Sequence, residues 1–517
     1  MNRTRPFRSI RRLAGIPAGL AAALLTVATA AVLNVVKIVC GGRPLLSRQR
    51  PEGDVMRSNT RTWLVTLVTA TAMVLLTSPA RAQQPVRTAG GHPSATSGDA
   101  VITWNNNAAD AALGACLAPT NNPLHEARMY AMMHIAIHDA LNAIDPRYRP
   151  YVLKHVHARG ASPEAAVAAA ARGVLVPLLQ QLPQPFSDCV TGAKVVEGVE
   201  AEYAAAIGAI PSGPAKTRGL AVGRAAAAAI LEARTADGSD TPLFDTAYHQ
   251  GTQPGQWRFT PGNDFAFAPG WSDVTPFVLK AASQFRPGPP YAVTSKQYAK
   301  DFNEVKRLGG DGVHTPSART ADQTQVALFW VESSPLRWNR IARTVAIKKG
   351  LDLWQSARLF GLLNMAMADG YVATFDTKYK AYNYWRPVTA IQNADTDGNP
   401  RTKADPTWTP LVTTPPIPAY DSGHSVEGAA AAQVLRQFFG TDHVRFATCS
   451  YTLPPGQTCT DASPVLRRYI TFTQASDENG LSRILVGFHF RKAVKEGIIH
   501  GTKIGAWAVS GFMQPVR

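Results

Sequence analysis

Three short segments in the C-terminal third of the chain combine basic side chains, glycine and histidine in a way that suits anion binding. The first segment begins at Lys378 and ends on Arg386-Pro387. An arginine guanidinium can donate to two oxygens of one anion, and a lysine adds a point charge. Because proline disfavours helical geometry in the residue before it, we expect Arg386 to project from a helix end.

The second segment is Ser422-Gly423-His424, followed by an apolar run with helical character at 426–439. We expect it to open a helix, whose exposed N–H groups and dipole attract an anion. Glycine lets the backbone approach a ligand, the serine hydroxyl can donate a hydrogen bond, and histidine can transfer a proton near neutral pH. This segment is therefore a candidate for anion binding and for acid–base chemistry.

The third segment contains Arg483 and His489, with Gly487 between them. Arginine supplies another cation, and histidine can act as a nucleophile or as a ligand through one ring nitrogen. Six residues of a regular helix turn a side chain by about 600°, so Arg483 and His489 would point to different faces of one helix. A local departure from the helix at Gly487 would be needed to bring them together.

Each segment has a simpler explanation when it is taken alone. Basic residues on a helix are usually solvated, and Ser-Gly-His can be an ordinary N-terminal cap. A histidine between Phe488 and Phe490 is by default a buried structural residue. All three segments together, in this order, are a more specific indication of an anion site than any one segment alone.

In this order the segments resemble the anion site of the vanadium-dependent haloperoxidases and the type 2 phosphatidic acid phosphatases. The shared pattern is a lysine followed by Arg-Pro, then Pro-Ser-Gly-His, then Ser-Arg with a histidine six residues after the arginine. The flanks at 384–391, 414–424 and 128–143 are similar to those of the bacterial haloperoxidase-like branch. The resemblance therefore runs from about residue 100 to residue 512.

The resemblance implies an all-α fold of helical bundles with long ordered loops, and one site that holds vanadate, or phosphate in its place. Matched position by position, it implies that His489 bonds the central atom, as the metal ligand of vanadate, and that His424 is the acid–base group. The residues that it places around the oxygens of the anion are Lys378, Arg386, Ser422, Gly423 and Arg483.

The spacing of the lysine leaves two candidates for one anion contact. Lys378 stands eight residues before Arg386, the longer spacing found in the algal bromoperoxidase-like branch, and Lys380 stands six before it. We choose Lys378 and keep Lys380 as the alternative.

Three other positions depart from the family pattern. Asp421 replaces the usual proline before Ser-Gly-His and would bring a carboxylate near the anion. Ala493 stands where many relatives have an aspartate, so the group that orients the His489 ring must come from elsewhere. Ile417 occupies a position where algal bromoperoxidases tend to have histidine, and an aliphatic side chain cannot assist halide chemistry by hydrogen bonding.

Three functions are compatible with these residues. The first is a vanadate-dependent haloperoxidase that oxidises halide with hydrogen peroxide, and the flanking sequences favour it. The second is an acid phosphatase that cleaves phosphate esters through a phosphohistidine at the same site. The third is a helical protein that binds an anion or a partner without turnover, which Asp421 and Ala493 would favour.

Helices are expected to position the three segments. Alanine-rich composition and three- and four-residue periodicity predict N-terminal helices within 101–235. A linking region at 236–300, rich in glycine, proline and aromatic residues, is expected to be a long ordered excursion. In the catalytic half, 301–517, helices are expected at 320–331, 340–371, 425–439, 465–475 and 481–512.

His134 and His138 stand one helical turn apart and could share a metal ion. No third ligand is evident from the sequence. We therefore interpret the pair as a packing and hydrogen-bonding contact between helices.

Two hydrophobic segments precede the enzyme-like part of the chain. Residues 13–36 follow five arginines and are long enough to span a bilayer. Residues 56–82 have a basic start, an apolar stretch and a small-residue cleavage site, the layout of a secretory signal peptide. We interpret 1–55 as an upstream extension or a membrane anchor, 56–82 as a signal peptide and 83–100 as a flexible arm. The protein is then exported, to the periplasm or the medium.

The net charge of +17 does not by itself indicate nucleic-acid binding. Residues 1–82 contain 12 Lys and Arg against 2 Asp and Glu, so most of the excess lies there. The remaining positive charges are scattered, with no basic run interleaved with aromatic residues. We expect small-molecule partners and no nucleic acid.

Four cysteines follow residue 82, and an even number in an exported chain predicts two disulfides. Cys449 and Cys459 would close a short loop, while Cys116 and Cys189 lie far apart in the sequence. The sequence alone leaves three pairings open.

Overall fold

The computed structural model describes residues 99–182 and 192–516, and most of their regular structure is helical. Helices of the first half are α3 (Ala100–Gly114), α4 (Pro123–Ile144), α5 (Pro163–Gln181), α6 (Gly192–Gly208) and α7 (Pro214–Ala233). Those of the second half are α8 (Lys296–Leu308), α9 (Ala321–Phe329), α10 (Ser334–Lys349), α11 (Leu353–Phe375), α12 (Pro387–Gln392), α13 (Gly423–Phe439), α14 (Phe472–Leu485) and α15 (Arg491–Gly511). The predicted all-α class is confirmed.

Short elements occupy the connections between these helices. A π-helical turn, η2 (Asp376–Tyr382), continues α11, and two 3-10 turns are η1 (Pro269–Asp273) and η3 (Ala394–Thr396). Strand β1 (Phe244–Asp245) pairs antiparallel with β2 (Ala266–Phe267), and β3 (Phe446–Thr448) pairs antiparallel with β4 (Arg467–Tyr469). The predicted linking region is thus an ordered loop with one small hairpin, and α8 begins inside its C-terminal boundary.

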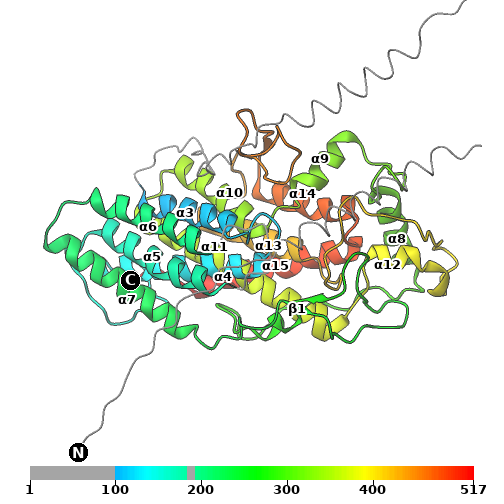
Figure 1. Ribbon diagram of the computed structural model, residues 1–517, viewed down its shortest axis with the longest axis horizontal. Coiled ribbons are helices and arrows are strands. Elements are labelled where there is room, and N and C mark those ends of the chain that lie inside the picture. The colour runs from blue at the N-terminus through cyan, green and yellow to red at the C-terminus, as the bar shows by residue number, and fades with distance from the viewer. Residues whose placement is uncertain (1–98, 183–191, 517) are drawn as a thin grey trace, which may run out of the picture. The chain divides into compact units, whose positions relative to one another are not determined.

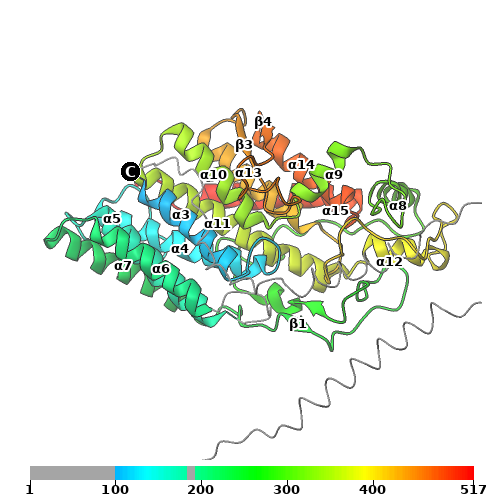
Figure 2. The same ribbon diagram turned by 45° about the horizontal axis from the view of Figure 1, so that its top comes forward.

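Helix α11 lies at the centre of the helical packing (Figure 1). It packs against α4 on one side and against α13 on the other, and α13 in turn packs against α15. Helices α5, α6 and α7 form a neighbouring group beside α4, as both views show (Figure 2). The helix that precedes the lysine segment and the helix opened by Ser-Gly-His are therefore direct neighbours.

Glycines allow α15 to approach α13 very closely. A Cβ atom added at Gly501 would lie 1.9 Å from the carbonyl oxygen of Val426, and one added at Gly505 would lie 2.4 Å from that of Ala430. At Gly497 the added atom would lie 2.8 Å from the Ser422 carbonyl. This one-per-turn row of glycines fixes the position of α15 against the start of α13.

Two predicted helices are each divided by a glycine with positive φ. The helix expected at 340–371 is α10 and α11, because Gly350 (φ 62°) ends α10 and Asp352 forms a capping box that starts α11. The helix expected at 481–512 is α14 and α15, with Gly487 (φ 88°) between them. A periodic apolar pattern continues across both breaks, so periodicity did not reveal them.

The prediction of a helix at 465–475 was wrong in its first part. Residues 467–469 form β4, which pairs with β3, and α14 begins only at Phe472 after its N-cap Thr471. Helices α3 and α8 were not predicted as separate elements, although Asp99 and Ser295 cap them in the usual way.

His134 and His138 have the packing role that was predicted for them. The His134 ring lies between Tyr130 and Phe360 and bonds Asn105 at 2.7 Å. His138 contacts the Asp139 carboxylate at 3.0 Å. No cluster of three or more metal-binding side chains occurs in the described residues.

One of the two predicted disulfides lies within the described residues. Cys449 and Cys459 are bonded, with their Cα atoms 5.2 Å apart, and the pairing of Cys189 lies outside that part of the chain. The segments 1–55 and 56–82, and residues 83–98 of the predicted arm, also lie outside it. Across the described residues, none of the helices has the length and apolar character that a membrane span requires.

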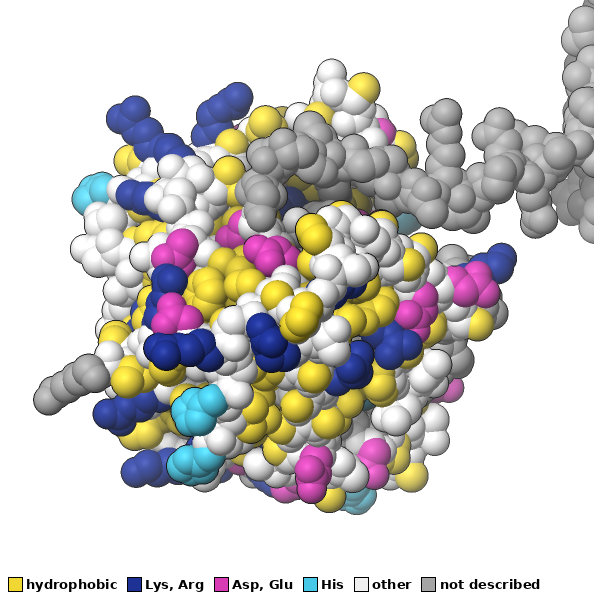
Figure 3. Space-filling view, turned by 90° about the vertical axis from the view of Figure 1, so that its left-hand side faces the viewer, with side chains coloured by type: hydrophobic (Ala, Val, Ile, Leu, Met, Phe, Trp, Pro, Cys, Tyr) yellow, Lys and Arg dark blue, Asp and Glu magenta, His cyan; other side chains and the backbone are white. Residues whose placement is uncertain are grey.

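Figure 3 shows one end of the molecule as a surface. Lys and Arg side chains are interspersed there with acidic and hydrophobic ones and do not gather into one patch.

Candidate functional site

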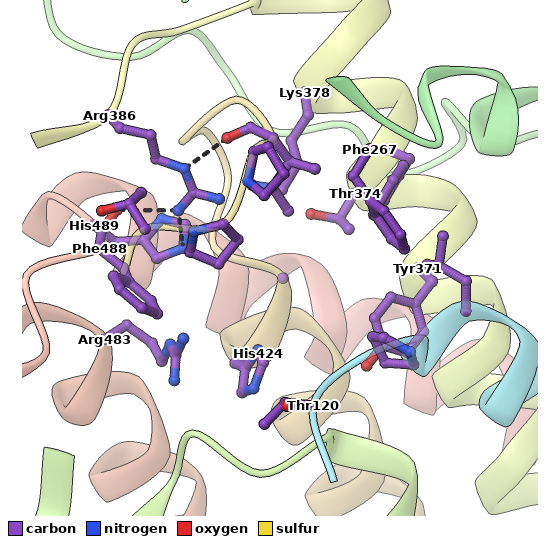
Figure 4. A pocket seen from close by; sticks show the side chains of 18 of the residues that line it. Thr120, Phe267, Tyr371, Thr374, Lys378, Arg386, His424, Arg483, Phe488 and His489 are labelled. Atoms are coloured by element: carbon purple, nitrogen blue, oxygen red, sulfur yellow. Dashed lines mark hydrogen bonds between the residues drawn. The ribbon is translucent and has the colours of Figure 1, made fainter. Parts of the chain in front are cut away.

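Most of the predicted site residues meet at one cavity of about 400 Å³ (Figure 4). Its walls come from the segment before α4, the linking region, α11 with η2, the loop before α13, and the α14–α15 connection. Six of the seven predicted residues line it, namely Lys378, Arg386, Gly423, His424, Arg483 and His489. The structure therefore brings the three sequence segments together.

Local geometry places the first segment as the sequence predicted. Arg386 is the N-cap of α12, with extended backbone (φ −81°, ψ 154°) imposed by Pro387. Lys378 projects from the π-helical turn η2 and is buried. The alternative, Lys380, is exposed and pairs with Asp273, so Lys378 is the lysine at the cavity.

A second hydrophobic cluster anchors the neighbours of the site. Trp385, adjacent to Arg386, and Phe490, adjacent to His489, are both buried against Tyr298 of α8. The Tyr298 ring centroid lies 6.5 Å from that of Trp385 and 5.5 Å from that of Phe490. Packing of these aromatic rings holds the arginine and the histidine on the same wall.

The α14–α15 connection returns His489 to the cavity that Arg483 faces. After α14 ends, the backbone N–H groups of Phe488 and His489 both donate to the Arg483 carbonyl, at 3.0 and 3.1 Å. Gly487 makes this reversal possible, because its φ of 88° favours glycine and an added Cβ would lie 2.7 Å from the Gly309 carbonyl. The sequence predicted a helix through 481–512 and indicated only that a departure at Gly487 would be needed to bring Arg483 and His489 together; the structure has that departure.

Ser422 is the predicted residue that does not line the cavity. It is the N-cap of α13, which places Gly423 and His424 in the first turn as expected. Its backbone N–H donates to the Ala493 carbonyl at 3.1 Å, and its hydroxyl accepts from Ser425 at 2.9 Å. In this structure the Ser422 hydroxyl contacts the first turn of α13 through Ser425 and makes no capping hydrogen bond to a backbone N–H.

Three buried cations at the cavity have backbone oxygens as partners. Arg386 donates to the carbonyls of Ile417 (2.6 Å) and Phe488 (3.1 Å), and Arg483 donates to that of Trp330 (3.0 Å). Lys378 donates to the carbonyls of Pro418 (2.8 Å) and Asp421. In the described residues, no carboxylate lies within ion-pair distance of any of the three.

Burial destabilises the protonated forms of these three groups, and a neighbouring cation adds to the effect at Lys378 and at Arg386. Burial, with the nearby Arg483, lowers the pKa of Arg386 to about 9, and burial lowers the pKa of Arg483 to about 10. Burial and the neighbouring Arg386 hold the pKa of Lys378 well below its ordinary value. A bound anion would stabilise all three charges, so the arrangement favours a multiply charged anion.

Both histidines are held neutral in this environment. Burial and the adjacent Arg386 lower the pKa of His489 well below its ordinary range, and burial with Arg483 does the same for His424. His489 Nε2 accepts from Arg386 at 2.9 Å. Within the described residues, His489 Nδ1, His424 Nε2 and Arg483 Nε are buried without a hydrogen-bond partner.

The positions that depart from the family pattern take other roles. The Asp421 carboxylate does not line the cavity, because it accepts from Thr374 (2.6 Å) and contacts His500 (2.9 Å). Arg386 contacts the His489 ring, and the Ala493 carbonyl accepts from the Ser422 N–H. Ile417 lines the cavity.

Sequence reasoning did not identify most of the wall. Phe244, Phe265 and Phe267 come from the linking region, and Tyr371 from α11. No local pattern assigns the three phenylalanines to a site whose first residue, Lys378, lies over 100 residues later in the chain. Glu427 also lines the cavity, and its place one turn after Gly423 was a signal that could have been used.

Comparison with known proteins finds sequence similarity in the C-terminal part of the chain. Residues 358–517 match the family model described as VCPO second helical-bundle domain. Vanadium chloroperoxidase from Curvularia inaequalis is 27% identical over 202 residues, which are 33% of this chain and 32% of that protein. The match thus spans about a third of the length of the curated relative.

Two solved structures have the same fold over most of the described chain. The first bacterial vanadium-dependent iodoperoxidase has a TM-score of 0.63 at 23% identity, covering 81% of this chain and 98% of that one. The holo form of a bacterial vanadium-dependent chloroperoxidase has a TM-score of 0.60 at 18% identity, covering 78% and 95%. Residues 358–517 therefore match a helical-bundle domain of the vanadium chloroperoxidase type, in a chain that has the fold of the bacterial vanadium haloperoxidases.

Proposed function

We propose that this protein binds vanadate in the cavity and acts as a vanadium-dependent haloperoxidase, oxidising halide with hydrogen peroxide. The observation that carries the proposal is the set of three buried cations that lack carboxylate partners and face two neutral histidines. The relatives named above are vanadium haloperoxidases, which favours this chemistry over others of the same site.

The donor set fits an oxyanion of this kind. A multiply charged anion needs several fixed donors in a site from which water is largely excluded. Arg483 Nε is buried without a partner in the described residues, and Lys378 and Arg386, whose partners include backbone carbonyl oxygens, also line the cavity. The N–H of Gly423, at the start of α13, adds the favourable end of a helix dipole.

The two histidines have different roles in this proposal. His489 is neutral, so a ring nitrogen can bond the central atom of the anion. His424 Nε2 lines the cavity with no partner in the described residues, and it can accept a proton there and return it. When bound, vanadate supplies the centre at which hydrogen peroxide is activated toward halide.

An acid phosphatase is the second candidate, because the same donors fit a phosphoryl group in transfer. In that case His489 would attack phosphorus and His424 would protonate the leaving group. The aromatic wall formed by Phe244, Phe265 and Phe267 does not separate the two functions, since it suits either an organic acceptor of halogen or an apolar ester.

Side-by-side assays separate the two. The purified protein, with and without orthovanadate, is tested for peroxide-dependent oxidation of iodide, bromide and chloride, and for hydrolysis of a phosphate ester. The proposal expects halide oxidation that requires vanadate, and phosphate-ester hydrolysis that vanadate inhibits or that is absent. Hydrolysis without any halide oxidation would establish the phosphatase instead, and neither activity would favour the non-catalytic function.

We also propose that the protein is exported. The signal-peptide layout of residues 56–82 and the Cys449–Cys459 disulfide both support an oxidising compartment. Mass determination of the natively produced protein is expected to find an N-terminus near Gln83. Recovery of a chain that retains residues 13–36 would favour a membrane anchor.

A further inference from the structure

One carboxyl group shares the cavity with the three cations. Glu427 lies on α13 one turn after Gly423, and its side chain is fully buried. Its Oε2 accepts from the Ser334 hydroxyl at 3.1 Å. Its Oε1 is buried with no hydrogen-bond partner in the described residues, and a Cβ added at Gly423 would lie 3.1 Å from it. The unpartnered oxygen therefore lies beside Gly423, at the helix start that is proposed to bind the anion, and Glu427 lines the same cavity.

The environment of Glu427 favours its neutral form. Burial raises the pKa of this carboxyl to about 8, and the negative charge of Asp421 adds to the effect. The Ser334 hydroxyl, Lys378 and Tyr371 oppose it, and Arg483 also interacts with the group. Near neutral pH the carboxyl is therefore protonated, and a protonated carboxyl has an O–H donor that an ionised one lacks.

We propose that Glu427 is an anion-binding residue of this site, and that its neutral carboxylic acid donates an O–H from Oε1 to an oxygen of the bound vanadate or phosphate. This inference rests on the proposed anion site. It explains why a carboxyl group can occupy a cavity built for an anion: the proton turns a repulsive group into a donor. An ionised Glu427 would have no donor and would repel the ligand.

The proposal makes anion affinity depend on one protonation equilibrium. Only the fraction of protein with neutral Glu427 is competent to bind, so the apparent Kd rises as that fraction falls. With a pKa of about 8 the fraction is close to one at about pH 6 and roughly one tenth at about pH 9. Glutamine at this position keeps an N–H donor at every pH.

Calorimetric titration with inorganic phosphate, and separately with orthovanadate, tests this on the full-length protein and its Glu427→Gln variant between about pH 6 and pH 9. The ratio of the parent Kd to the variant Kd cancels the protonation of the anion itself. We expect a ratio that is constant up to about pH 7 and then rises by about tenfold toward pH 9.

Glu126→Gln is the matched control. Glu126 is also fully buried with a pKa raised to about 8, but it does not line the cavity, so this variant should follow the parent. Circular dichroism of each variant establishes that it is folded. Glu427→Ala is a second variant that lacks the carboxyl donor, and we expect it to bind the anion more weakly than the parent at about pH 6.

The outcomes separate the inference from the proposed function. If the parent binds neither anion at any pH, the cavity is not an anion site, and both the proposed function and the role of Glu427 are overturned. If the parent binds but the ratio stays constant with pH, Glu427 is not the titrating donor and only the inference is overturned. Tighter binding by Glu427→Gln at every pH would identify Glu427 as an ionised counter-charge to the cations and would also overturn the inference.

Discussion

Replacement of Gly497 by alanine should loosen the contact between α15 and α13 and thereby damage the site. The added Cβ would lie 2.8 Å from the Ser422 carbonyl oxygen and 2.9 Å from Cβ of Ser425. Non-bonded carbon atoms prefer about 3.5–4.0 Å, so α15 must withdraw by roughly 0.6–1 Å. Overpacking of this kind costs about 1–3 kcal/mol of unfolding free energy.

The functional effect should follow from the same displacement. The Ser422 N–H donates to the Ala493 carbonyl, one turn before Gly497 on α15, so withdrawal of α15 breaks a bond that fixes the start of α13. His424 would then shift relative to His489. A displacement near 1 Å can cost about 100-fold in rate, so we expect weaker anion binding and much lower turnover.

Gly511→Ala is the control on the same helix, because a Cβ there has nothing within 4 Å. Urea unfolding followed by circular dichroism, with phosphate titration by calorimetry, compares both variants with the parent. The control should stay within about 0.5 kcal/mol of the parent and bind normally. If Gly497→Ala is as stable as Gly511→Ala and binds phosphate as the parent does, close packing of α15 does not position the site.

Two further predictions concern the charged and acid–base groups. Lys378→Met should weaken vanadate binding by about 10–100-fold, the cost of a charge-assisted hydrogen bond of about 1.5–3 kcal/mol. Lys380→Met, which removes an exposed charge, should leave the Kd unchanged within about twofold, and equal effects of the two in calorimetry would show that the lysine was assigned wrongly. His424→Ala should keep most of the anion affinity and lower halide oxidation by about 10²–10⁴-fold; a steady-state assay that finds turnover unaltered would remove His424 as the acid–base group.

Local rules allowed the sequence to predict the conformations of individual segments. Proline after Arg386 made that residue extended, and Ser422 became an N-cap because a helix-forming apolar run follows it. The alanine-rich composition and the three- and four-residue spacing of apolar residues predicted the helical class, because alanine has a high helix propensity. These features depend on residues within a few positions of one another.

Tertiary packing determined the features that the sequence did not predict. Gly487 reverses the chain where Gly309, Trp408 and Pro410 pack around it, and none of these is near it in sequence. That reversal brings Arg483 and His489 to one cavity, which helical periodicity alone excluded. Glu427 lies within an apolar helical pattern, and its spacing from Gly423 was the one local signal for it; that it lines a cavity depends also on segments far from it in the sequence.

His489 is proposed to bond the central atom of an anion held in this cavity, and the decisive experiment is calorimetric titration of the parent and its His489→Ala variant with orthovanadate. One vanadate should bind per parent chain. We expect affinity weaker by more than about 100-fold in the variant, since loss of even a supporting group beside a metal ligand costs about 10–100-fold. A folded His489→Ala variant that binds vanadate as tightly as the parent would contradict the account and make His489 a structural residue.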